Sequence, residues 1–433
     1  MGMMEKKAYL LTGIISMLLA VICLNAGCLE ANQQPADEAE SQDTDISERK
    51  TGGDWELWTN GTLLRGANIY QRRVYPELDG ADFIGPGPVG PPYTQEDIDA
   101  LAALGANYVQ VSHPGLFGEK PPFGLDQDMQ DNLDRLLDMI DEAGMYAVIS
   151  FRTGPGRSEF TFFWDEVGTW FDACYLNDSV WEDPAAQDAW AAMWRYTARR
   201  YCRHPAVVGY ELMVEPNSND RLLDIWDPEE FYDEYAGTLY DWNQLFPCIT
   251  SAVREVDEET PVLVGGNGYS AIDWLTYVVP SRDTRTVYTF HQYAPYVYTH
   301  QEAEEAGLTY PGVFDVDDDG VDDVLDRGGL NHMLSTVDDF AAAHGAPLAL
   351  TEYGVVRWAP GAGLFISDQL DLLEERGINH AIWVWDPSWE PWNMEIDAFN
   401  FMHGPYPDNH RDVDTSRLIE VITRCWERNL QGS

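Results

Sequence analysis

Basic residues are scarce in this chain of 433 residues. It contains 26 Lys and Arg against 74 Asp and Glu, which gives a formal net charge of −48 at pH 7. Phosphate groups are bound by clustered basic residues, so this charge argues against a nucleic-acid partner and against polybasic docking on an anionic membrane. Acidic residues at this density predict a hydrated, halophilic surface whose self-repulsion is screened by high salt.

Other common signatures are also lacking. No glycine-rich phosphate-binding motif follows any expected strand, which disfavours a dinucleotide-binding open sheet. The body of the chain has few cysteines, and their wide spacing is compatible with two disulfides or with buried thiols: Cys174, Cys202, Cys248 and Cys425. Hydrophobic residues make up 45% of the chain and aromatic residues 12%, which excludes a disordered acidic polymer.

A long apolar run occurs at the N-terminus. Lys6 and Lys7 precede the apolar residues 8–24, as in a signal peptide, so we predict that residues 1–28 direct export. The small residues before Cys28 resemble a lipoprotein processing site, although the usual leucine stands one position early at Leu24. We therefore expect an extracellular or cell-surface protein whose membrane contact is a lipid on Cys28. An ordinary signal peptide and an uncleaved anchor are the alternatives.

The next segment, residues 29–50, is acidic and polar with almost no apolar side chains. Such a composition cannot bury enough surface to fold. We predict that it is a disordered tether and that residues 51–433 form the folded domain.

Short apolar runs alternate with longer segments of helical periodicity through the rest of the chain. The expected strands are residues 64–70, 108–112, 146–151, 207–214, 261–264, 286–292, 348–351 and 381–385. The expected helices include residues 95–104, 129–143, 185–201, 229–256 (one helix or two), 334–343, 364–376 and 418–428. Strands that are apolar at consecutive positions are covered on both faces and are therefore parallel. Eight strand–helix units predict an α/β fold of the (β/α)₈ TIM-barrel type, with an open doubly wound sheet as the alternative.

Two glutamates stand at strand ends, where a barrel carries its chemistry. Glu215 follows the fourth expected strand and Glu352 follows the seventh, so the two side chains face each other across the barrel mouth. Retaining glycoside hydrolysis uses a pair of carboxyl groups about 5–5.5 Å apart, one donating a proton and one attacking the anomeric carbon. We predict that Glu215 and Glu352 are catalytic. Because acidic residues are frequent here, chance placement is the alternative.

The residues around these glutamates resemble glycoside hydrolase family five, the cellulase and mannanase family of clan A. The resemblance is carried by Leu64-Arg65-Gly66-Ala67-Asn68, Gly154-Pro155-Gly156, Glu215-Pro216, His291-Gln292-Tyr293, Thr351-Glu352-Tyr353-Gly354 and Trp385, in that order along the strands. It implies that Glu215 is the acid/base and Glu352 the nucleophile. It also implies that His291 and Tyr293 form hydrogen bonds near the two glutamates, with Tyr293 bonded to the nucleophile. Trp385 would form the floor of the site in which the sugar ring sits.

Three positions depart from the family pattern. Val214 replaces the usual asparagine before the acid/base, so we consider Asn217 as a donor to the sugar. Arg152 stands where a histidine is frequent, and His113 where an arginine is common. An exchange of roles would let Arg152 orient Glu352 and His113 reach the ligand. The alternative is that both are structural polar residues.

Tryptophans are frequent in the expected loops: Trp164, Trp170, Trp226, Trp389 and Trp392. Aromatic rings stack on the flat C–H faces of sugars, so a row of them suggests a cleft for more than one sugar unit. Ordinary packing under long loops is the alternative reading of each tryptophan.

Residues 315–326 have the spacing of a calcium-binding loop. The expected ligands are Asp315, Asp317, Asp319, Val321 through its carbonyl, Asp323 and Asp326, with Gly320 at the turn. We predict a structural Ca²⁺ here and no cofactor for catalysis. A solvated acidic loop is the alternative.

Together these features predict an exported, retaining glycoside hydrolase that acts on a β-1,4-glucan or β-mannan polysaccharide or oligosaccharide. An exo-glycosidase or transglycosylase of the same clan is one alternative. A sugar-binding barrel that has lost catalysis is another, and Val214 is the feature that favours it.

Overall fold

The computed structural model describes residues 53–80, 84–304, 306–316, 320–386, 389 and 394–430. The predicted export segment, Cys28 and the tether lie outside these residues. Within the described part, none of the helices has both the length and the apolar character needed to cross a bilayer.

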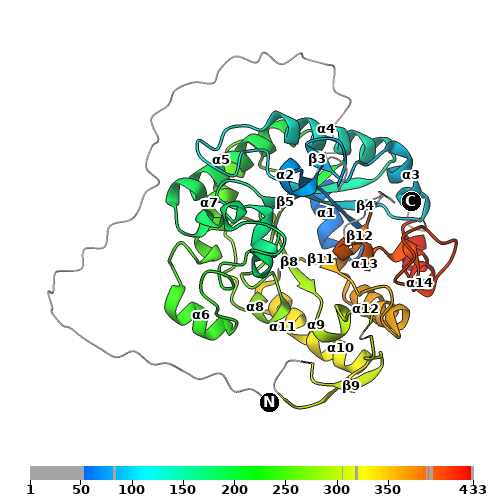
Figure 1. Ribbon diagram of the computed structural model, residues 1–433. Helices are drawn as coiled ribbons and strands as arrows, with labels where there is room; N and C mark the ends of the chain where they lie inside the picture. The colour runs from blue at the N-terminus through cyan, green and yellow to red at the C-terminus, as the bar shows by residue number, and fades with distance from the viewer. Residues whose placement is uncertain are drawn as a thin grey trace. The chain divides into compact units, whose positions relative to one another are not determined.

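Eight parallel strands close into a barrel in the order β1-β12-β11-β8-β7-β6-β5-β4 (Figure 1). They are β1 (Arg65–Tyr70), β4 (Tyr108–Pro114), β5 (Tyr146–Thr153), β6 (Val207–Glu211), β7 (Val262–Val264), β8 (Thr286–Gln292), β11 (Leu348–Tyr353) and β12 (Asn379–Trp385). Nearly every strand residue is buried, because the barrel interior covers one face and the helices cover the other. The predicted TIM barrel is confirmed, and the open sheet is excluded.

Helices surround the barrel and connect its strands (Figure 1). The longer ones are α3 (Gln95–Ala103), α4 (Gln127–Glu142), α5 (Pro184–Tyr201), α6 (Pro228–Tyr235), α7 (Trp242–Arg254), α10 (Arg327–Met333), α11 (Ser335–His344), α12 (Ala362–Arg376) and α14 (Arg417–Trp426). The segment predicted as one helix or two forms two, since Gly237 adopts a positive φ of 77° and Asp241 caps the start of α7.

Short elements lie between the longer ones. Besides several 3₁₀ turns they are α1 (Gly53–Thr59), β2 (Arg72–Arg73), α2 (Pro76–Asp79), β3 (Val89–Gly90), α8 (Ile272–Leu275), α9 (Tyr296–Thr299), β9 (Gly312–Phe314), β10 (Asp323–Leu325) and α13 (Met394–Phe399). The helix α1 closes the amino-terminal end of the barrel. Its Trp58 packs on inward-facing residues and donates from Nε1 to the carbonyl of Val208 at 3.0 Å.

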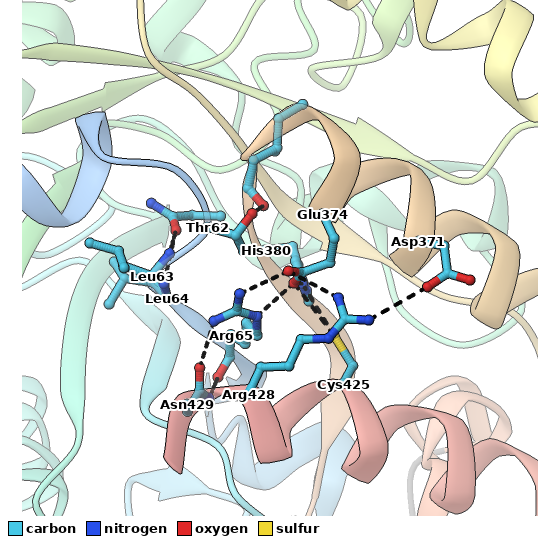
Figure 2. A network of polar contacts seen from close by, with 12 residues as sticks. Thr62, Leu63, Leu64, Arg65, Asp371, Glu374, His380, Cys425, Arg428 and Asn429 are labelled. Carbon is cyan, nitrogen blue, oxygen red and sulfur yellow. Dashed lines mark hydrogen bonds and ion pairs between the residues drawn. The ribbon is translucent and has the colours of Figure 1, made fainter. Parts of the chain in front are cut away.

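A polar network ties the first strand to the last helices at this same end (Figure 2). Arg65 donates to both carboxylate oxygens of Glu374, at 2.6 and 2.8 Å, and Arg428 pairs with Glu374 at 3.0 Å. Burial opposes ionisation, but the hydrogen bonds from Arg65 and His380 outweigh it and lower the pKa of Glu374. Burial raises the pKa of the neighbouring Cys425 thiol to about 12, which keeps it neutral. The network therefore joins β1, α12, β12 and α14 around one partly buried carboxylate.

The structure shows whether the four cysteines of the folded domain form disulfides. Cys174, Cys202, Cys248 and Cys425 all lie in the described part, and none of them forms a disulfide there. Of these four thiols only that of Cys425 is buried, so the alternative of buried thiols holds for that residue alone.

Candidate active site

Glu215 lies just beyond β6, in a backbone conformation that is unusual for a residue with a side chain. The strand ends at Glu211, and Glu215 has a positive φ of 52°. Arg157, which is fully buried in the loop after β5, donates to the carbonyls of Val214 and Glu215, each at 2.6 Å. These two hydrogen bonds from one guanidinium stabilise the strained turn, and they thereby fix the direction of the Glu215 side chain.

Glu352 lies near the end of β11, and its carboxylate meets two side chains from the end of the neighbouring strand β8. Tyr293 donates from its hydroxyl to Oε1 of Glu352 at 2.9 Å. His291, at the end of β8, donates from Nδ1 to Oε1 of Glu215 at 2.9 Å and lies 3.8 Å from Oε2 of Glu352. A carboxylate oxygen of Glu215, a ring nitrogen of His291 and a carboxylate oxygen of Glu352 all lie within 4.8 Å of one another. The structure thus brings together four of the predicted site residues.

The charges in this cluster influence one another strongly. Burial and the nearby Glu215 raise the pKa of Glu352 to about 7, against the opposing effects of His291, Arg152 and Tyr293. Burial alone would lower the pKa of His291, but the carboxyl groups of Glu352 and Glu215 raise it to about 9. At neutral pH the imidazolium of His291 therefore lies between two carboxyl groups that interact too closely to titrate independently.

Arg152 lies at the end of β5. Its predicted partner was Glu352, but the carboxylate that it contacts is that of Glu159. It pairs with Glu159 at 3.2 Å, and Tyr70 donates to the same oxygen at 2.9 Å. Its guanidinium lies 4.2 Å from the ring centre of Phe162 and 5.7 Å from that of Trp383. Arg152 therefore acts on Glu352 through its charge, and its hydrogen bonds are made to Glu159.

The predictions for His113 and Asn217 are wrong. His113 is fully buried and faces the helices: Nε2 lies 2.9 Å from the side-chain oxygen of Asn132 on α4, and Nδ1 lies against the carbonyl of Pro114. Asn217 is 3% exposed and accepts from Arg157 at 3.0 Å. Its amide lies within hydrogen-bonding distance of the hydroxyls of Thr161 and Tyr269. Both side chains are already satisfied by the protein and are not available to a sugar.

The prediction that Trp385 forms the floor of the sugar site is also wrong. Its ring packs on Phe401, which in turn packs on Trp426 of α14, so it faces the helical shell. Trp383 instead has its ring edge-on to Tyr70, 5.9 Å between centres, beside Arg152. The pairing of β1 with β12 shifts register between Ala67 and Ile69. This bulge changes which residues of β12 face inward.

A pair of stacked rings starts beside Glu215 and leads out to solvent. The backbone N–H of Tyr269 donates to the carbonyl of Pro216 at 3.1 Å, and its hydroxyl donates to Asp220. Trp226 stacks on Tyr269 with 6.1 Å between ring centres and 11° between planes, and it is 56% exposed. Trp164 joins the group by donating to Asp220 at 2.8 Å. Trp170 packs among phenylalanines, whereas Trp392 lies outside the described residues.

The loop predicted to bind calcium joins β9 to β10, which pair as an antiparallel hairpin. Gly320 has the positive φ expected at the turn, 85°, and its N–H donates to the side chain of Asp315 at 2.8 Å. Asp326 accepts from Gly329 at 3.0 Å and caps α10, a role the spacing did not indicate. Val321 and Asp323 are exposed, and Asp317 and Asp319 lie outside the described residues. The calcium site stays a prediction.

Three further residues of the site were not predicted from the sequence: Arg157, Glu159 and Trp383. Each has a partner that is distant in the sequence. Arg157 donates to the carbonyl of Glu215, Glu159 accepts from Tyr70, and the ring of Trp383 lies edge-on to Tyr70. Arg157 and Glu159 are two charged residues between Gly154-Pro155-Gly156 and an aromatic-rich stretch, and this is the local sequence feature that marks them.

Known proteins resemble the chain over most of its length. A family model described as cellulase (glycosyl hydrolase family 5) matches residues 77–388. Endoglucanase C of Acetivibrio thermocellus is 24% identical over 359 residues, which cover 76% of this chain and 91% of the relative. Cellodextrinase A of Ruminococcus flavefaciens is 22% identical over 60% of this chain and 68% of the relative. The structure of Thermotoga maritima Cel5A with mannotriose superimposes with a TM-score of 0.59 at 18% identity, covering 85% of this chain and 99% of that one. This structural likeness concerns the fold alone.

Proposed function

The chain belongs to glycosyl hydrolase family 5, and on that premise we propose that it cleaves internal linkages of a β-1,4-glucan with retention of configuration. Glu215 is the proposed acid/base and Glu352 the proposed nucleophile. Relatives named endoglucanase support the choice of a β-glucan, and the mannotriose complex of the Thermotoga protein makes β-mannan the second candidate substrate.

The observation that carries the retaining mechanism is the closeness of the two carboxyl groups. An oxygen of Glu215 and one of Glu352 lie within 4.8 Å of each other. Inverting enzymes need about 6.5–9.5 Å between the two groups to admit a water molecule, whereas retaining enzymes need about 5–5.5 Å. The short separation favours direct attack by a carboxylate on the sugar.

The proposed first step transfers a proton from Glu215 to the glycosidic oxygen while Glu352 attacks the anomeric carbon. The bond to the leaving sugar breaks, and that sugar departs as an alcohol. In the second step Glu215, now ionised, takes a proton from water, whose oxygen attacks the same carbon and releases Glu352. Tyr293 and His291 hold the two carboxyl groups in position through the contacts described above. These steps need no cofactor.

The stacked rings of Trp226 and Tyr269 support action on a chain of several sugars. They begin next to Glu215, which protonates the leaving group, so a ring stacked there belongs to the leaving portion of the substrate. Binding on this side favours endo-type cleavage over removal of single terminal sugars.

A sugar-binding barrel without turnover is the second candidate, and one observation favours it. Val214 is buried and offers no side-chain hydrogen bond, and Asn217 is occupied by Arg157. A bond to the sugar 2-hydroxyl stabilises the transition state in this chemistry, so its loss would slow hydrolysis.

The setting of the enzyme is also part of the proposal. Export, a lipid on Cys28, a structural Ca²⁺ in residues 315–326 and tolerance of high salt all rest on sequence patterns. The membrane contact would be that lipid alone.

The experiment that tests the function is hydrolysis of cellohexaose and mannohexaose at high and low salt, with the newly formed anomer followed by proton NMR. We expect the β-anomer to form first and internal bonds to be cut. Initial release of the α-anomer would overturn the retaining mechanism. Tight binding without any product would favour the sugar-binding barrel.

A further inference from the structure

A third carboxyl group lies beneath the proposed catalytic pair. Glu211 is the last residue of β6, four positions before Glu215, and it is 3% exposed. Its side chain points into the barrel, and the proposed mechanism gives it no task. A carboxyl group at such a depth loses its hydration, so its retention calls for partners that replace water.

Its partners are neutral side chains from four other strands, and one of them is Ser150 on β5. Gln110 on β4 donates to Oε2 at 2.7 Å, and its own amide oxygen is held by the hydroxyl of Tyr108 at 2.6 Å. Thr351 on β11 donates to Oε1 at 3.0 Å, and Thr289 on β8 donates to the same oxygen at 3.4 Å. Every one of these contacts offers a hydrogen to the carboxyl group, which is the arrangement an ionised carboxylate accepts.

Two of these partners belong to the strands that carry the site. Thr351 directly precedes Glu352, and Thr289 stands two positions before His291. Alternate residues of a strand face the same side, so Thr289 and His291 both point into the barrel. A bond from Glu211 to each threonine therefore fixes the ends of β8 and β11 relative to β6.

Glu211 also acts on His291 through its charge. The carboxyl groups of Glu352, Glu215 and Glu211 all raise the pKa of His291, and the charge of Arg152 lowers the pKa of Glu352. Burial raises the pKa of Glu211, and the positive charge of His291 and its donors oppose this effect. The two groups support each other, since each favours the charged form of the other.

We propose that Glu211 is a positioning residue for the hydrolysis, which holds the ends of β8 and β11 from below and thereby places His291 and Glu352. This proposal rests on the proposed function. If Glu211 only filled space in the barrel, its replacement would leave the pKa of His291 unchanged. In the proposed role, loss of its charge lowers the pKa of His291.

The test compares three variants of the full chain. Glu211→Gln keeps the size of the side chain and removes its charge. Glu211→Asp keeps the charge and shortens the side chain. Glu374→Gln removes a partly buried carboxylate at the opposite end of the barrel, where the network of Figure 2 gives it a purely structural setting.

In Glu211→Gln we expect kcat on cellohexaose to fall roughly tenfold with little change in KM, since misplaced catalytic groups slow the chemical step more than they weaken binding. Loss of a negative neighbour lowers the pKa of His291, so the alkaline limb of the pH profile moves to lower pH. Glu211→Asp should retain the wild-type alkaline limb. Glu374→Gln should lower the melting temperature and leave the pH profile as it is.

A readout independent of turnover is the NMR titration of His291, assigned through His291→Asn. The imidazole should lose its proton at lower pH in Glu211→Gln than in the wild type. An unchanged titration and pH profile in Glu211→Gln would overturn the proposal. If the wild type lacks activity, the proposed function fails, and the histidine titration still decides the role of Glu211.

Discussion

His291 donates a hydrogen bond from Nδ1 to the carboxylate of Glu215 at 2.9 Å. A buried cation thus contacts the proposed acid/base and lies 3.8 Å from the proposed nucleophile. When Glu352 forms an ester with the sugar its negative charge disappears, and Glu215 becomes the ionised partner. The same imidazolium can stabilise the negative charge in both states, because it lies near both carboxyl groups.

The roles of the two glutamates can be separated by the leaving group. We expect Glu352→Ala to lose about 10³-fold or more in kcat on every substrate, since the nucleophile is required in each case. Glu215→Ala should lose a similar factor on cellohexaose but far less on an aryl cellobioside, whose phenolate leaves without a proton. Initial rates on both substrates measure this. Near wild-type hydrolysis of cellohexaose by either variant would remove that residue from the mechanism.

The stability of the fold should depend on the protonation of His291. Its pKa is raised from 6.5 to about 9, so its stabilising contribution is fully present below pH 6.5 and is lost as the pH rises through 9. We expect the free energy of unfolding of the wild type to fall by up to roughly 3 kcal/mol more than that of His291→Gln over this window. Urea unfolding of both proteins at pH 6, 8 and 9.5 measures the difference. Parallel curves for the two proteins would contradict it.

Trp226→Ala should weaken binding on the leaving-group side. A stacked ring contributes about 0.5–1.5 kcal/mol beyond its buried area, so KM for cellohexaose should rise roughly threefold to tenfold. Hydrolysis of an aryl cellobioside should change little, because its leaving group does not extend to this ring. Trp226→Phe keeps an aromatic face and is the matched control. Equal loss on both substrates would place Trp226 in the fold and not in the substrate site.

Calcium should stabilise the hairpin formed by β9 and β10. We expect a chelator to lower the melting temperature and Asp315→Asn with Asp323→Asn to abolish that effect, since both carboxylates are expected ligands. Asp322→Asn is the control, because position eight of the loop is not a ligand position. Melting curves with calcium and with chelator decide the matter. Identical curves in the wild type would show that the acidic loop is solvated and binds no calcium.

The sequence alone determined the architecture and the two acids at its mouth. Consecutive apolar positions require strands covered on both faces, and eight such strands alternating with helices close into a barrel. The barrel places all strand ends on one rim, so Glu215 and Glu352 had to lie near each other wherever the loops ran. These conclusions need only the period of the pattern and the order of the elements.

Tertiary structure alone decided which side chains reach the site. Trp383 faces inward like Ala381 two positions earlier, but a bulge in β12 turns Trp385 outward, and a one-residue shift of this kind leaves no local mark in an apolar strand. The buried Arg157 holds Val214, 57 positions away in the chain, and Glu211 meets Thr351, 140 positions away. Such contacts depend on register and packing between distant strands. Composition and spacing could therefore identify the proposed catalytic pair, but not the residues that hold it in place.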